Sequence, residues 1–124
     1  MKNERSKKLS MKHFTVKLGE VVNAKYSEED LVDILSNISF ELINITLSTK
    51  KNYLGMNATG YSAVGFVNSF DPEEKTFKVV VFDNKSNFIE DLGELVIVPR
   101  VFTNRNGEIT KVIGLDVEPV AVAE

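Results

Sequence analysis

"YSAVGFVNSFDPEEKTFKVVVFD", residues 61–83, is the stretch of sequence that decides the fold. In it, two apolar runs rich in β-branched and aromatic residues flank the polar segment DPEEK. Pro72 presets a φ angle that suits a turn, and the side chain of Asp71 can accept hydrogen bonds from the turn backbone. The stretch therefore predicts an antiparallel hairpin.

A second hairpin is predicted in residues 94–122, ELVIVPRVFTNRNGEITKVIGLDVEPVAV. The pair Asn106-Gly107 is the strongest short-range turn signal in the chain, because both residues readily take positive φ angles. Pro99 has no backbone N–H to donate. The first arm is therefore predicted to be an edge strand or to carry a bulge at Pro99.

The register of this second hairpin has two alternatives. A two-residue loop places Arg105 opposite Glu108. A four-residue loop, 104–107, matches the apolar side chains better but sets Arg100 beside Lys111. Like charges opposite one another normally destabilise a sheet. Either the second register is wrong, or Arg100 and Lys111 meet an anion or an acidic partner.

One helix is predicted within residues 26–38, YSEEDLVDILSNI. Ser27 is a suitable N-cap, and the acidic residues that follow it complement the positive end of the helix dipole. Apolar side chains recur at helical spacing, at Leu31, Ile34, Leu35 and Ile38. This apolar face is expected to pack on a sheet.

Two more strands are predicted on either side of the helix. Residues 12–18 alternate, with Phe14, Val16 and Leu18 on one face. Residues 40–48 change their apolar phase between Leu42 and Ile43, which indicates a bulge or a strand covered on both faces. The fold class is therefore mainly β with one helix (α+β), as a small antiparallel barrel or sandwich of about six strands.

Charge divides the chain into a basic arm and an acidic body. The 124 residues predict one β-rich domain over residues 12–124, preceded by a disordered basic N-terminal arm, residues 1–11. Residues 1–12 carry a net charge of +4, which leaves −7 for the rest of a chain whose total is −3. The arm is either a solvated terminus or a contact for nucleic acid or an acidic partner. The acidic body argues against a surface that coats DNA.

Composition also limits the compartment and the chemistry. The chain contains no Cys, which excludes disulfides, thiolate catalysis and Cys-ligated metals. It has no apolar run long enough for a membrane span and no pattern typical of a secretory signal. The expected location is the cytoplasm, or the virion if a phage encodes the protein.

The stretch "GMNATGYSAVGF", residues 55–66, resembles a phosphate-binding loop at first sight. Such a loop needs Lys directly after its second glycine, and here Tyr61 follows Gly60. The prediction is instead a hinged loop that leads into a strand thinned at Gly65, for a bend or a close backbone neighbour. Its exposed large side chains are candidate partner-binding residues: Tyr53, Met56 and Tyr61.

No catalytic or metal-binding set can be assembled from the sequence. Residues 83–94 match an EF-hand loop poorly, because Lys85 and Phe88 occupy positions that need a ligand and a glycine. The stretch is predicted to be a polar loop with Phe88 and Ile89 turned inward. Asp116 and Glu118 share a phase on one strand, which is typical of a solvated face. We expect no enzyme activity, no cofactor and no metal.

A basic and aromatic patch is the alternative basis for binding. Lys78 shares its strand phase with Phe82, and Arg100 shares its phase with Phe102. These four residues form a nucleic-acid or anion site if the two strands are neighbours, with Lys111 as a further cation. The other interpretation is that the Phe residues belong to the core and the cations to its rim.

The leading hypothesis is a non-catalytic structural or assembly subunit of a larger protein complex. A compact β body, a basic arm and an apolar C-terminal segment, VEPVAVAE, favour self-association or docking on a neighbour. Abundant Asn, Lys and Ile are typical of AT-rich genomes, and an accessory protein of a phage virion fits this description. The alternatives are a nucleic-acid-binding small β-barrel and a small-ligand or anion-binding protein.

Overall fold

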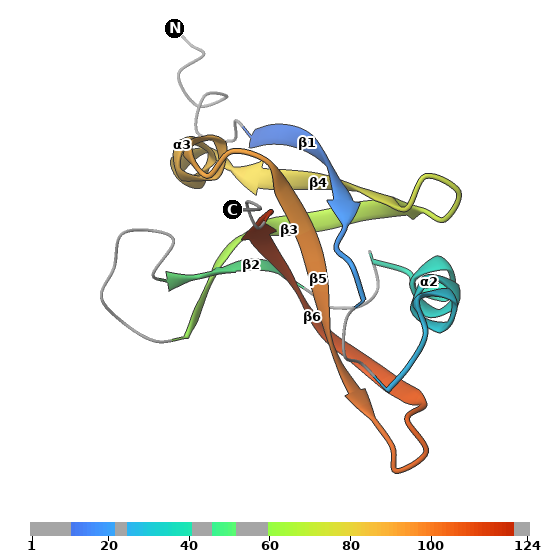
Figure 1. Ribbon diagram of the computed structural model, residues 1–124. Helices are drawn as coiled ribbons and strands as arrows, with labels where there is room; N and C mark the ends of the chain where they lie inside the picture. Colours follow the sequence, from blue (N-terminus) through green and yellow to red (C-terminus); the bar gives the residue numbers. More distant parts are fainter. Residues whose placement is uncertain (1–10, 22–24, 41–45, 52–59, 121–124) are drawn as a thin grey trace, which may run out of the picture.

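Six strands form a closed barrel in the order β1-β4-β3-β2-β6-β5 (Figure 1). The computed structural model describes residues 11–21, 25–40, 46–51 and 60–120. The strands and helices are β1 (Met11–Leu18), α2 (Glu28–Asn37), β2 (Thr46–Lys50), β3 (Tyr61–Asp71), β4 (Thr76–Phe82), α3 (Asp83–Asp91), β5 (Leu95–Thr103) and β6 (Ile109–Pro119). The predicted mainly β fold is confirmed. Of the two predicted architectures, barrel and sandwich, the structure has the barrel.

The barrel is not wholly antiparallel. Neighbouring strands are antiparallel in four pairs, but β1 runs parallel to β5 and β2 runs parallel to β6. The β1–β5 pairing is short, with only Lys17↔Val96 and Leu18↔Ile97 in register. The barrel is therefore closed by a narrow seam.

The hairpin predicted from residues 61–83 is formed by β3 and β4. Oδ1 of Asp71 accepts hydrogen bonds from the backbone N–H groups of Glu73 and Glu74, at 2.9 and 3.3 Å. Phe70 pairs with Phe77, and the two rings pack with their centroids 4.7 Å apart. The local turn chemistry was sufficient to predict this hairpin.

Gly65 lies where two backbones approach closely. A Cβ atom built on Gly65 would overlap the carbonyl oxygen of Val80 and contact Cα of Val81 at 2.9 Å. Only glycine leaves the space for the β4 backbone. The predicted close backbone neighbour at Gly65 is confirmed.

The second hairpin, β5–β6, has neither of the predicted registers. Asn104 N–H donates to the carbonyl of Glu108 at 2.9 Å, so the turn spans five residues. Thr103 then pairs with Ile109 and Phe102 pairs with Lys111. Arg100 lies opposite Gly114, so the prediction that it lies beside Lys111 is wrong.

The longer turn and two bulges explain this error. The register shifts between Arg100 and Val101 and again between Phe102 and Thr103, and each shift inserts one extra residue into β6. Hydrophobic matching assumes regular alternation, which these bulges interrupt. The first shift follows Arg100, and its extra residue, Ile113, belongs to β6, so the bulge predicted at Pro99 in the first arm is not observed.

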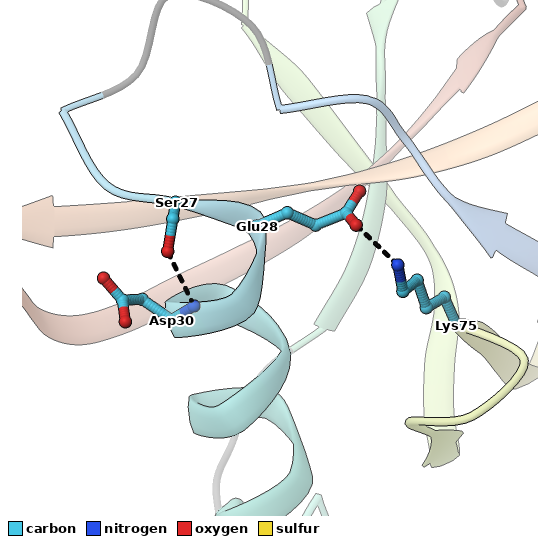
Figure 2. A network of polar contacts seen from close by, with 4 residues as sticks. All are labelled: Ser27, Glu28, Asp30 and Lys75. Carbon is cyan, nitrogen blue, oxygen red and sulfur yellow. Dashed lines mark hydrogen bonds and ion pairs between the residues drawn. The ribbon is translucent and has the colours of Figure 1, made fainter.

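The predicted helix is α2, and its N-terminus is tied to the β3–β4 turn (Figure 2). The hydroxyl of Ser27 accepts a hydrogen bond from Asp30 N–H at 3.1 Å. Glu28 Oε1 forms an ion pair with Nζ of Lys75 at 2.6 Å, as Figure 2 shows. Leu31 and Leu35 are buried in the core, as their spacing predicted.

Residues 83–91 form the helix α3, so the prediction of a loop there is wrong. Ser86 and Ile89, three residues apart, are buried. Ser86 Oγ donates to the carbonyl of Asp83 at 3.0 Å. The segment has too few apolar residues for a helical period to stand out, and packing against β4 and β1 decides its conformation. The inward orientation of Ile89 is confirmed.

The core fills the barrel and continues under α2. Its largest fully buried side chains are Phe77, Leu31, Leu35, Leu47, Ile97 and Leu115. The predicted phase change at Leu42 and Ile43 lies outside the described residues. Within the described residues, no helix is long and apolar enough to cross a membrane.

Candidate functional site

The outer face of the β5–β6 hairpin carries the most unusual polar arrangement of the described chain. Ile97 is buried and Val101 packs against the core, so the residues that alternate with them on β5, Arg100 and Phe102, point outward. We call the group formed by Arg100, Gly114, Asp116 and Tyr61 the Arg100 cluster. Its members come from three strands, β5, β6 and β3.

Arg100 is held from three sides. Its Nε lies 2.8 Å from Oδ2 of Asp116, and its guanidinium carbon lies 4.6 Å from the centre of the Tyr61 ring. A Cβ atom on Gly114 would overlap the guanidinium, so the absence of a side chain there lets Arg100 lie flat across β6. The cluster fixes a long, normally mobile side chain in one orientation.

Asp116 is buried although it faces outward. Its side chain is 3% exposed, against 35% for Arg100. Ser48 on the neighbouring strand β2 pairs with Asp116 and is itself buried. Among the described residues, Oδ1 of Asp116 accepts no hydrogen bond, and the contact with Arg100 is an ion pair rather than a well-aligned hydrogen bond.

Burial raises the pKa of the Asp116 carboxyl above its ordinary value, because desolvation disfavours the charged form. The positive charge of Arg100 opposes this effect and lowers the pKa, but it does not cancel the burial. Glu118 raises the pKa slightly further, and Lys50 lowers it. The sequence prediction of a solvated face for Asp116 and Glu118 is therefore wrong for Asp116.

Two further predicted residues lie along the same outer face. Phe102 and Lys111 are cross-strand partners near the hairpin turn, and both are exposed. Phe102 is 56% exposed, which is high for a Phe side chain, and Ile113 at the bulge is exposed as well. The structure therefore places Tyr61, Arg100, Phe102 and Lys111 on one side of the barrel. Tyr53 and Met56 lie outside the described residues.

Lys78 and Phe82 lie elsewhere. They are on β4, and β1 separates β4 from β5, so the four-residue basic and aromatic patch is not assembled. Val79 and Val81 belong to the core, so Lys78, Val80 and Phe82 point outward. The rings of Phe82 and Phe66 make an edge contact, with centroids 6.0 Å apart. We call Lys78, Val80, Phe82 and Phe66 the β4 face.

Sequence reasoning missed the role of Asp116. One of the two predicted registers set Arg100 beside Lys111, and neither included the bulge at Ile113 that brings Arg100 opposite Gly114. One signal was present: Gly114 precedes Asp116 by two residues, so a glycine and a carboxylate lie on the same face of the strand. A glycine inside a strand often marks such a close approach.

The side chains of Arg100 and Tyr61 are of types that bind partner groups. An oriented guanidinium next to an aromatic ring recognises carboxylates and planar groups, and both residue types are frequent in protein interfaces. Within the described ranges, no three His, Asp or Glu side chains are placed to hold a metal ion.

No protein-family model matches the chain, and neither a curated protein nor a solved structure matches it significantly.

Proposed function

We propose that this protein is a non-catalytic assembly subunit that joins other copies of itself in a larger protein complex. The contact surface is the outer face of the β5–β6 hairpin, from the Arg100 cluster to Phe102. A particle built of repeated protein subunits, such as a phage virion, or a cytoplasmic complex would suit such a subunit.

One observation carries the proposal: a rigidly held Arg100 lies beside exposed apolar side chains. Arg and Tyr dominate the binding energy of protein interfaces, particularly where the side chain is ordered before binding. Arg100 is ordered by Asp116 and Tyr61. Phe102 supplies exposed apolar area on the same face, and Figure 1 shows β5 and β6 continuing past the other strands toward their turn.

Light-scattering mass over a range of protein concentrations tests self-association. The mass is expected to exceed that of one chain, 13.9 kDa, and Phe102→Ser is expected to return it toward that value. Phe66→Ser is the matched control, because Phe66 is also an exposed Phe on the barrel wall but belongs to the β4 face. A mass of one chain at every concentration would overturn the proposal.

A second candidate function is binding of single-stranded nucleic acid to the β4 face. Phe66 and Phe82 offer ring surfaces, and Lys78 lies on the same strand as Phe82. The outward phase of the neighbouring strand β1 adds Lys17, which lies opposite Thr76. Met11, where β1 begins, pairs with Phe82 at this face.

This second function predicts affinity for oligothymidylate that falls steeply between about 50 and 200 mM salt. Lys78→Glu should weaken binding, whereas Lys111→Glu, an equal change of charge on a different face, should change it much less. Equal losses in both variants would show that the net charge of the protein, rather than the β4 face, governs the affinity.

A further inference from the structure

A cavity of about 460 Å³ opens through the barrel wall between β1 and the segment that leads from α3 into β5. One side is formed by residues 14–17 of β1 and the other by residues 93–96, with Ile89 of α3 beside them. Its floor is formed by buried side chains of the packed core, among them Leu47 and Val117. It is separate from both the Arg100 cluster and the β4 face.

The short seam between β1 and β5 accounts for the cavity. Only Lys17 and Leu18 pair with β5, so the first part of β1 is bonded to β4 on one side and to no strand of the described chain on the other. In Figure 1, α3 lies at this end of the barrel, beside the start of β1 and the end of β4. A helix covers such a gap less completely than a hydrogen-bonded strand would.

The inner wall of the cavity is aliphatic. Its buried lining consists of Val16, Leu47, Val79, Val81, Ile89 and Val117. Such a wall provides no hydrogen bonds, so water in the cavity would lack the polar partners that ordered internal water needs. Pockets of this size with a mainly apolar lining hold small molecules.

The charges at the mouth are balanced. Lys17, Glu90 and Glu94 lie at the opening, and Glu90 forms an ion pair with Lys12 at 3.6 Å. Two cations therefore face two anions, and the mouth favours neither an anionic nor a cationic ligand. Phe14, half-buried at the opening, adds an aromatic surface.

We infer that the barrel binds a neutral, largely hydrocarbon small molecule, which enters between β1 and residues 93–96. The aliphatic interior excludes nucleotides, sugars and inorganic ions, because burying their polar groups without hydrogen bonds is strongly unfavourable. This inference is independent of the proposed assembly function, since the two surfaces share no residue.

Titration with the neutral dye N-phenyl-1-naphthylamine, which fluoresces in apolar surroundings, tests the inference. Wild-type protein should bind the dye in a saturable manner. Val81→Phe fills the cavity and should weaken binding by about tenfold or more. The matched control is Val80→Phe, the same change one residue away: Val80 is also buried, at 5% exposed, but its side chain lies outside the barrel core, so the affinity should stay within about twofold. Equal affinities of the two variants would overturn the inference.

A second measurement needs no variant and therefore remains decisive if Val81→Phe fails to fold. Methyl NMR spectra of the wild-type protein under xenon, an apolar probe of dry cavities, should show shifts at Val79, Val81, Ile89 and Val117. The methyl groups of Val80, which lie outside the barrel, should not shift. Shifts spread over both sets, or no shift at saturating xenon, would contradict a specific apolar cavity.

Discussion

Arg100 reaches past the residue opposite it in register and lies with Nε 2.8 Å from Oδ2 of Asp116, two positions further along β6. This diagonal is possible because Gly114, the residue in between, has no side chain. The ion pair therefore depends on a bulge, a glycine and a carboxylate that are close in β6. It holds the surface of the proposed interface in one arrangement before any partner binds.

Loss of Arg100 should destabilise the protein because it leaves a buried carboxylate without a partner. For Arg100→Ala at neutral pH, we expect the free energy of unfolding to fall by about 2 kcal/mol, below the cost for fully buried pairs because Arg100 is partly exposed. Adding Asp116→Asn should restore most of this loss. Urea unfolding of both single variants and the double variant completes the cycle, and additive effects would contradict a coupled pair.

The free energy of unfolding should depend on pH in the way that the raised pKa of Asp116 requires. Its pKa is raised in the folded protein, so folding favours the protonated carboxyl, and its contribution to stability is lost as pH rises through the folded pKa. The stability of Asp116→Asn relative to wild type should therefore increase with pH above the ordinary value of 3.8 and then level off. Urea unfolding across this range measures it. A relative stability that falls with pH would mean that the ion pair, not burial, dominates.

Two glycines should respond differently to substitution by Ala. Gly65→Ala places Cβ against the backbone of Val80, which cannot move without distorting β4, so we expect a loss of about 3 kcal/mol. Gly114→Ala meets only the flexible side chain of Arg100, and about 1–2 kcal/mol should be lost with the ion pair. In an Arg100→Ala background, Gly114→Ala should cost much less. An unchanged cost there would show that the β6 backbone, not Arg100, requires the glycine.

The cap of α2 should contribute a measurable share of stability. Ser27→Ala removes the acceptor for Asp30 N–H and should lower the free energy of unfolding by about 1 kcal/mol. Ser36→Ala is the control, because Ser36 is exposed and its hydroxyl donates only to Val32 of the same helix, so its effect should stay within about 0.5 kcal/mol. Thermal unfolding of both variants checks the comparison, and equal losses would exclude a specific role for the cap.

Local signals predicted the parts of the fold that local chemistry decides. Asp71 and Pro72 encode their turn, and Ser27 with the apolar spacing after it encodes α2. The helix α3 escaped prediction because only its packing on the barrel reveals which face of residues 83–91 is buried. The register of β5–β6 escaped because bulges leave no pattern in hydrophobic alternation.

The candidate site was predicted only in part, because some of its features depend on local sequence and others on which strands are neighbours. The exposure of Tyr61 was predicted from the glycine-hinged loop, and the side chain is exposed. Strand alternation put Arg100 and Phe102 in one phase, but it left open whether that phase faces the core or the solvent. Tyr61 on β3 contacts Arg100 on β5, although β2 and β6 lie between these two strands in the barrel. No local rule of sequence specifies that strand order. Burial of Asp116 depends on β2 lying beside β6 in parallel, which the sequence does not reveal.

The two-residue seam between β1 and β5 also has a consequence for how the chain reaches its native state. It joins residues 17–18 to residues 96–97, so its formation must overcome the loop-closure entropy of nearly eighty residues for only a few backbone bonds. The β3–β4 and β5–β6 hairpins join neighbours in the chain and can form early. We therefore expect closure of the barrel to come last in folding, and the seam amides to exchange with solvent before the rest of the sheet.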